Sequence, residues 1–88
     1  MTNFDDFIKL IQSIKDEESL KDLLIGVTTP KERDELVKRI EIIKLLISGE
    51  PQKKIASDLG VGIATVTRGS KELSAGRFKT LRIKQWPY

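Results

Sequence analysis

The sequence predicts an all-α protein, a short helical domain with a helix-turn-helix near its C-terminal end. Two observations support this fold class. Apolar residues recur three and four positions apart from residue 4 to residue 73, and a glycine corner separates two short segments of this kind. No stretch shows the convincing alternation of a strand. We therefore expect a helical domain over residues 1–76 and a basic tail over residues 77–88.

Size and composition narrow the possible functions. The chain has 88 residues, so it forms one small domain with a modest core, and a second copy is a natural source of stability. It has no cysteine and no histidine, which excludes disulfides and removes the best zinc ligands, so we expect neither a metal nor a cofactor. Without a histidine to activate a nucleophile, an enzyme is not expected. The acidic start and the lack of an apolar run of about 20 residues favour a cytoplasmic protein.

Two short helices are expected first. Asn3 and Asp6 have the spacing of a capping box, and they precede an amphipathic segment of roughly a dozen residues. A second helix is expected to begin at Ser19 and to end at Gly26. The first helix carries its apolar stripe on Phe4, Phe7, Ile8, Ile11 and Ile14.

A long helix follows. Thr29 is placed to cap it, Pro30 suits its first position, and Glu32 can reach back to the cap amide. We expect the helix to run to Ser48, with Gly49 as its stop. Its apolar positions cover more than one face, which predicts burial on two sides, the second by another copy of the chain. They are Leu36, Val37, Ile40, Ile42, Ile43, Leu45, Leu46 and Ile47.

The helix-turn-helix is expected over about residues 51–73. Gly60 supplies the positive φ angle at the corner, between a helix over residues 51–59 and a second helix over residues 62–73. Val66 is the buried residue of the second helix. Ile55, Ala56 and Leu59 form the apolar stripe of the first, and Val61 fills the crevice. Side chains expected to be free for recognition are Ile63, Ala64, Thr65, Thr67 and Arg68.

A helix-turn-helix of this kind is expected to dock its second helix in the major groove of DNA, and two alternatives exist for the segment. A helical hairpin with no DNA partner uses the same glycine turn. Residues 60–65 also spell part of a dinucleotide-binding fingerprint, but no strand precedes them and too little chain follows for the rest of that unit.

Charge is distributed unevenly along the chain. Residues 1–49 hold eight basic and ten acidic residues, whereas residues 50–88 hold eight basic and three acidic residues. This asymmetry suits a phosphate-binding face, although a solvated basic surface is the plain alternative. In the tail, Trp86 is interpreted as a packing anchor rather than as a side chain that stacks on nucleic acid.

The segments TPKERDELVKRIEIIKLLISGE and LGVGIATVTRGSKEL together resemble the Trp repressor family, over roughly residues 20–73. The resemblance implies an all-helical, intertwined homodimer. It also implies that the dimer binds a palindromic double-stranded DNA operator and that L-tryptophan, as co-repressor, orients the two reading helices.

The resemblance implies a set of residues around the amino acid. Arg39 and Arg68 match the arginines that sandwich the indole, and Arg68 also meets the carboxylate, as guanidinium chemistry permits. Thr29 matches the threonine at the edge of the family's ligand pocket, and Gly69 matches the glycine that leaves room for the indole ring. The plain alternatives are surface arginines, a helix cap and a weak point in a helix. The full implied set is Gly26 and Thr28, through backbone carbonyls, with Thr29, Arg39, Arg68, Gly69 and Glu72.

The resemblance also implies a DNA-binding set. Phosphate contacts position such a protein and base contacts specify the sequence. Lys53→Ala should therefore weaken binding to all DNA alike, and Thr67→Ala should erode discrimination. The residues at the start of the first reading helix are Gln52, Lys53 and Lys54, and those on the second are Gly62, Ile63, Ala64, Thr65, Thr67 and Lys71.

Several positions depart from the family pattern. The link from Gly49 to Gly60 is one residue shorter, and Lys71 and Glu72 stand where the family has Asn and Ser. Glu72 could bind an ammonium group or repel a carboxylate. A regulator of the same fold that is constitutive or answers another small ligand is therefore the second hypothesis, and a helical protein-interaction module is a third.

Overall fold

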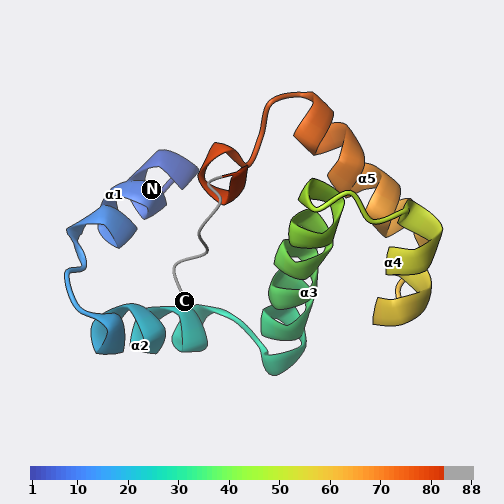
Figure 1. Ribbon diagram of the computed structural model, residues 1–88. Helices are drawn as coiled ribbons and strands as arrows, with labels where there is room; N and C mark the ends of the chain where they lie inside the picture. The colour runs from blue at the N-terminus through green and yellow to red at the C-terminus, as the bar shows by residue number, and fades with distance from the viewer. Residues whose placement is uncertain (83–88) are drawn as a thin grey trace. The chain divides into compact units, whose positions relative to one another are not determined.

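The computed structural model describes residues 1–82 of the chain. Over these residues it contains five α-helices, one short 3-10 helix and no strand, so the prediction of an all-α fold is confirmed (Figure 1). No helix within residues 1–82 has the length and apolar content needed to cross a membrane. Trp86, and the interpretation placed on it, lie outside the described residues. The helices are α1 Phe4–Ser13, α2 Glu17–Val27, α3 Pro30–Ile47, α4 Gln52–Leu59, α5 Ile63–Ser74 and the 3-10 helix Lys79–Arg82.

The chain forms two compact units, residues 1–34 and residues 35–88, with the boundary inside α3. The first unit contains α1, α2 and the first turn of α3. The second contains the rest of α3, with α4, α5 and the 3-10 helix. The predicted extents of the helical domain and of the basic tail stay predictions.

Two predicted helix starts are confirmed in the first unit. The Asn3 side chain accepts a hydrogen bond from the Asp6 amide at 2.9 Å, and the Asp6 carboxylate accepts one from the Asn3 amide at 3.2 Å. Thr29 and Glu32 make the same reciprocal pair, at 3.1 Å and 2.8 Å. Each pair satisfies two amides that have no partner inside the helix.

The predicted boundaries of the second helix are wrong at both ends. The Asp16 carboxylate accepts a hydrogen bond from the Ser19 amide at 2.8 Å, so Asp16 is the cap and α2 begins at Glu17 rather than at Ser19. Gly26 does not end α2. A glycine stops a helix when it adopts a positive φ angle, and Gly26 keeps a negative one, so α2 continues through Val27.

Arg33 closes the C-terminal end of α2. Its Nη1 donates to the carbonyl oxygens of Ile25 at 3.2 Å and Thr28 at 2.9 Å, and to the Thr28 hydroxyl at 3.1 Å. These carbonyls have no amide partner within the helix, so the guanidinium satisfies them and complements the negative end of the helix dipole.

The most deeply buried cluster of the second unit takes one residue from each of three helices. Ile42 of α3, Ile55 of α4 and Val66 of α5 are at most 1% exposed and pack together. Around them lie partly buried apolar residues, which include the predicted Ala56, Leu59 and Val61. The predicted buried positions of the helix-turn-helix are thus confirmed, and α4 and α5 lie beside α3 as Figure 1 shows.

The glycine corner also has the predicted geometry. Gly60 has a φ of 65°, and the amide of Val61 donates to the Ala56 carbonyl at 3.0 Å, which closes the end of α4. The start of α4 differs slightly from the prediction, because Pro51 is its cap and Gln52 its first residue. The end of α3 agrees within one residue, with Gly49 at a φ of 90°.

Much of the apolar surface of α3 is uncovered. Leu36, Val37, Ile40 and Ile47 are exposed, with Val37 at 69%. Such a row along one helix is more than scattered surface residues would produce, and it is compatible with the second copy that the sequence predicts.

Candidate ligand pocket and DNA-binding helices

A cavity of about 690 Å³ lies between α3 and α5 in the second unit. This volume is within the range typical of small-molecule sites. Its wall combines apolar side chains with two guanidinium groups and one carboxylate. The lining residues are Leu36, Arg39, Ile40, Ile42, Ile43, Ala64, Thr65, Arg68, Gly69, Glu72 and Phe78.

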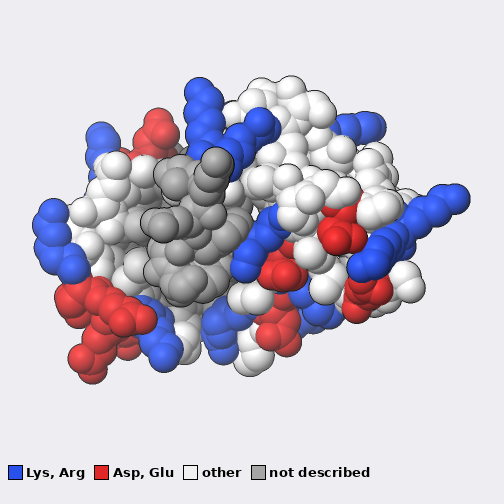
Figure 2. Space-filling model, viewed as in Figure 1, with Lys and Arg blue, Asp and Glu red and all other residues white. Residues whose placement is uncertain are grey.

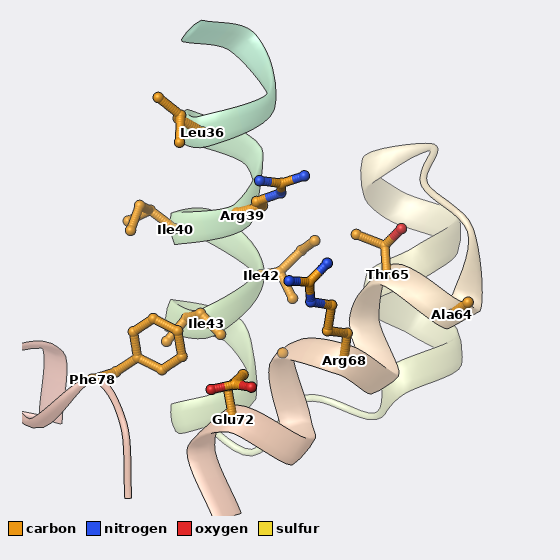
Figure 3. A pocket seen from close by; sticks show the side chains of 11 residues that line it. Leu36, Arg39, Ile40, Ile42, Ile43, Ala64, Thr65, Arg68, Glu72 and Phe78 are labelled. Carbon is orange, nitrogen blue, oxygen red and sulfur yellow. The ribbon is translucent and has the colours of Figure 1, made fainter. Parts of the chain in front are cut away.

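Arg39 and Arg68 approach the cavity from opposite helices. Figure 3 shows Arg39 extending from α3 toward α5, and Arg68 extending from α5 toward α3. Within residues 1–82 neither guanidinium makes a hydrogen bond or an ion pair. Two unpaired guanidinium groups in one cavity provide planar donors for a carboxylate and flat faces for an aromatic ring.

Glu72 contributes the acidic group of the cavity. Its Oε2 lies 3.3 Å from Nε of Arg77, and the side chains are 46% and 73% exposed. Ion pairs this exposed contribute little free energy, so Arg77 orients the carboxylate without preventing it from meeting another cation. The cavity therefore offers partners to both charges of a zwitterion.

Gly69 has a structural role as well as a place in the cavity wall. A Cβ atom at this position would lie 3.0 Å from Cδ1 of Ile43 and 3.4 Å from Cγ2 of Ile42. The glycine therefore permits the close approach of α5 to α3. This packing role is sufficient to explain a glycine in the middle of a helix, where it costs about 1 kcal/mol relative to alanine.

The structure brings four of the seven predicted ligand residues together, namely Arg39, Arg68, Gly69 and Glu72. The other three, Gly26, Thr28 and Thr29, belong to the first unit and are absent from the cavity wall. The Thr28 carbonyl, predicted to meet the ligand ammonium, accepts the hydrogen bond from Arg33, and Thr29 acts as the cap of α3. The ligand roles of these three residues stay predictions.

Helix α5 presents the predicted DNA-facing residues at its first turn. Gly62 is its cap, and Ile63, Ala64 and Thr65 are exposed. The cap carries no side chain and makes no side-chain hydrogen bond to the helix, so the positive end of the helix dipole is open.

The prediction that Thr67 is free is wrong. Thr67 is half-buried, and its hydroxyl donates to the Gln52 side-chain oxygen at 2.9 Å. Gln52 is also half-buried and is the first residue of α4. The hydrogen bond therefore ties the start of α4 to the middle of α5, an interaction that residue spacing alone does not reveal.

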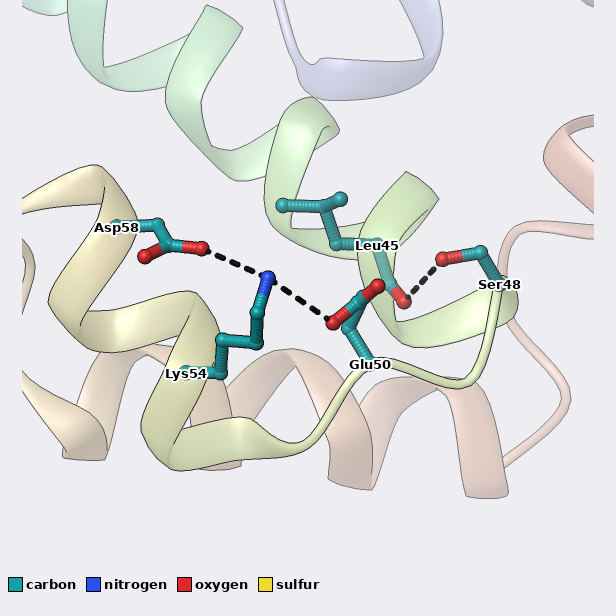
Figure 4. A network of polar contacts seen from close by, with 5 residues as sticks. All are labelled: Leu45, Ser48, Glu50, Lys54 and Asp58. Carbon is teal, nitrogen blue, oxygen red and sulfur yellow. Dashed lines mark hydrogen bonds and ion pairs between the residues drawn. The ribbon is translucent and has the colours of Figure 1, made fainter.

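Lys53 and Lys54, at the start of α4, differ in whether an acidic side chain pairs with them. Nζ of Lys54 lies 3.1 Å from the Asp58 carboxylate and 3.4 Å from the Glu50 carboxylate, as Figure 4 shows. The hydrogen bond that Lys54 donates to Asp58, followed by the one that it donates to Glu50, raises the pKa of Lys54. Lys53 is exposed and makes no hydrogen bond or ion pair with the described part of the chain. Lys53 is thus the better placed of the two to contact a phosphate.

Basic side chains do not stand apart from acidic ones on the surface. On the face drawn in Figure 2, lysine and arginine side chains project beside carboxylates, and Lys71 of α5 is exposed. The positive charge of the second half of the chain is therefore partly compensated, as Lys54 illustrates.

Comparison with known proteins decides the family. The family described as Trp repressor protein matches residues 2–81 of the chain. The chain belongs to the Trp repressor family. The resemblance seen in the helix-turn-helix thus extends through α1 and into the 3-10 helix.

Members of the Trp repressor family from Vibrio species are similar over most of their length. A Trp operon repressor homolog of Vibrio campbellii is 45% identical over 69 residues, which cover 77% of this chain and 69% of the relative. Homologs from Vibrio vulnificus and Vibrio cholerae are 41% and 44% identical, over 82% and 77% of this chain and 72% and 67% of theirs. As a Trp repressor family member, this chain is a transcriptional repressor and not an enzyme.

Two residues of the second unit are not predicted by the sequence patterns. Phe78 lines the cavity, and Arg77 holds Glu72. Both lie after Gly76, where the helical periodicity ends, so no spacing rule connects them with α3. The five-residue separation of Glu72 and Arg77 indicates an ion pair only if the turn at Gly76 is recognised.

Proposed function

We propose that this Trp repressor family member acts as a homodimer that binds a palindromic DNA operator through α5, with L-tryptophan as co-repressor. The observation that carries the proposal is that the first turn of α5 forms part of the cavity wall. Ala64 and Thr65 belong to the first turn of α5, where the residues predicted to face DNA lie, and both also line the cavity. A ligand in the cavity would therefore contact the backs of residues at the reading end of α5.

The cavity chemistry suits an aromatic amino acid. Arg68 can pair with the carboxylate in a bidentate manner, and its plane and that of Arg39 can cover the faces of an indole ring. Glu72 can accept hydrogen bonds from the ammonium group. Ile40 and Ile43 supply the apolar surface that a ring requires.

The DNA-binding part of the proposal is supported by exposure and charge. Ile63, Ala64 and Thr65 project from the first turn of α5, while Lys53 stands at the start of α4 with no partner among the described residues. In a dimer that meets successive major grooves, the two α5 helices would lie about 34 Å apart. The exposed row Leu36, Val37, Ile40 and Ile47 on α3 supports dimerisation by apolar burial.

The Glu72 carboxylate also favours a second candidate, a repressor of the same fold that answers a different cationic or zwitterionic ligand. A ligand with two carboxylates would be repelled by Glu72, whereas one with an additional ammonium group would gain an ion pair. The two candidates differ only in the ligand, so direct titration separates them.

The test combines calorimetry with DNA binding. L-tryptophan is titrated into the purified chain and into Arg68→Ala, with Lys71→Ala as the control because Lys71 lies on the same helix outside the cavity wall. Removing a charge-assisted hydrogen bond worth about 1.5–3 kcal/mol should weaken binding about 10- to 100-fold in Arg68→Ala. Lys71→Ala should bind as the unaltered chain does.

Duplexes for the DNA arm are selected from a random pool in the presence of L-tryptophan. Fluorescence anisotropy on the selected duplex should then show tighter binding with the amino acid than without it, and affinity should fall steeply with salt. Equal operator affinity with and without L-tryptophan, together with no calorimetric heat, would refute the co-repressor role and favour the second candidate.

A further inference from the structure

The segment after α5 folds back on the end of that helix. Gly76 adopts a φ of 93°, and the Arg77 amide donates to the Glu72 carbonyl at 3.0 Å. This is the arrangement in which a glycine terminates a helix and reverses the chain. Arg82, at the end of the 3-10 helix, then donates to the Leu73 carbonyl. The turn is therefore held at its start and at its end.

Phe78 has an unusual backbone conformation within this turn. Its φ is 65°, and it is the one non-glycine residue with a positive φ among the described residues. An aromatic residue pays a steric penalty in the left-handed region, so the surrounding interactions must maintain it. The Phe78 carbonyl accepts from the Leu81 amide at 3.0 Å, and Arg77 beside it pairs with Glu72.

The conformation directs the Phe78 ring to the cavity. Phe78 is half-buried and lines the wall, and Figure 3 shows its ring beside Ile43, away from Arg39 and Thr65. Arg39 thus lies at one end of the cavity, and Phe78, Ile43 and the Glu72 carboxylate lie at the other. Among the described residues, Phe78 is the one aromatic side chain in the cavity wall.

We propose that Phe78 is a specificity residue whose ring closes the end of the cavity opposite Arg39 and limits the size of the aromatic ligand that fits. The inference rests on the proposed function, because it assumes that an aromatic amino acid binds there. The two guanidinium groups would hold the ligand carboxylate and cover the faces of the ring, and Glu72 would meet the ammonium group. The Phe78 ring would then contact the ligand and exclude bulky substituents from its end of the cavity.

The test compares two ligands on the full chain. L-tryptophan and a benzyloxy-substituted L-tryptophan are titrated calorimetrically into the unaltered chain and into Phe78→Ala. Alanine pays a similar backbone penalty at positive φ, so the substitution mainly reports the removal of the ring. Phe4→Ala is the matched control, since Phe4 is 72% exposed in the first unit and outside the cavity.

The unaltered chain should prefer L-tryptophan. In Phe78→Ala, affinity for L-tryptophan should fall about 2- to 10-fold because the aromatic ring is gone from the wall. Affinity for the larger ligand should rise, so that the ratio of the two dissociation constants shifts about 10-fold or more. Phe4→Ala should leave the ratio unchanged. If Phe78 had only a structural role, Phe78→Ala would weaken the binding of both ligands equally and would leave the ratio of their dissociation constants unchanged.

The outcomes separate this inference from the proposed function. If the unaltered chain binds L-tryptophan and the ratio is the same in Phe78→Ala, the inference is overturned and the co-repressor role stands. If the unaltered chain binds neither ligand, the proposed function fails and takes this inference with it. Should circular dichroism show Phe78→Ala to be unfolded, Phe78→Leu decides, with a smaller shift of the ratio in the same direction expected and no shift overturning the proposal.

Discussion

The hydrogen bond between Thr67 and Gln52 joins the two helices of the helix-turn-helix, and its removal should have a measurable cost. Thr67→Val deletes the hydroxyl and keeps a β-branched side chain of nearly the same shape. Gln52→Met deletes the acceptor in a similar way. The donor and acceptor are 2.9 Å apart and both residues are half-buried, so water can partly replace the hydrogen bond. We expect a coupling free energy of about 0.5–1.5 kcal/mol, toward the lower end of that range.

A double-mutant cycle measures this coupling by urea denaturation of four proteins: the unaltered chain, the two single variants and the double variant. All four are compared at one protein concentration, because the apparent stability of a dimer depends on concentration. The decreases in the free energy of unfolding of the two single variants are summed and compared with the decrease in the double variant. If the two values agree within about 0.3 kcal/mol, the hydrogen bond does not stabilise the unit.

DNA binding by the same four proteins identifies the role of Thr67. If the hydroxyl acts through Gln52, both single variants should lose discrimination between selected and random duplex to the same extent, and the double variant should lose no more. If Thr67→Val still loses discrimination in the Gln52→Met background, Thr67 reads a base directly. The positioning role is then refuted.

Three further predictions concern charge, packing and pH. The logarithm of the DNA-binding constant falls linearly with the logarithm of the salt concentration, and Lys53→Ala should reduce the steepness of this slope by about 0.9 for each phosphate that is no longer neutralised. Lys54→Ala should reduce the slope less, because Nζ of Lys54 already meets two carboxylates. Anisotropy at several salt concentrations checks this, and an equal or larger effect at Lys54 would contradict it. Val66→Ala should destabilise the chain by about 2 kcal/mol or more in urea denaturation, since Val66 is fully buried, and an effect no larger than that of an exposed valine would count against the core assignment. The hydrogen bond from the Ser19 amide lowers the pKa of Asp16, so the stabilisation by this cap is present above the ordinary pKa of the carboxyl and is lost as pH falls through the lowered one. Asp16→Asn keeps a cap without a titrating group, so helical circular dichroism between about pH 5 and pH 2 should change less in the variant, and an identical pH profile would exclude the role of Asp16.

The local signals of this sequence are sufficient for most of the helical framework. The capping pairs at Asn3 and Thr29 involve residues three positions apart, so their geometry follows from the helix itself. The positive φ angle of Gly60 and the burial of Val66 follow from a corner and a periodicity that are likewise local. Where two local signals compete the prediction is wrong, because Asp16 captures the amide of Ser19, the residue expected to start the helix.

The candidate site depends in part on the family pattern. Arg39 and Arg68 are 29 positions apart in the sequence, and no periodicity indicates that they share a cavity. The resemblance to the Trp repressor family supplies that pairing. It does not supply Phe78, whose segment follows a turn that the local pattern leaves undefined.

The sequence by itself determined the order of the helices, the caps at Asn3 and Thr29, the glycine corner and the family, because each depends on residues within a few positions or on a continuous motif. Only the tertiary structure decided that Thr67 bonds Gln52 and that Phe78 lines the cavity with Glu72. These interactions depend on how helices pack and on which rotamer each side chain adopts there. A side chain has several partners within reach along the chain, and packing selects among them.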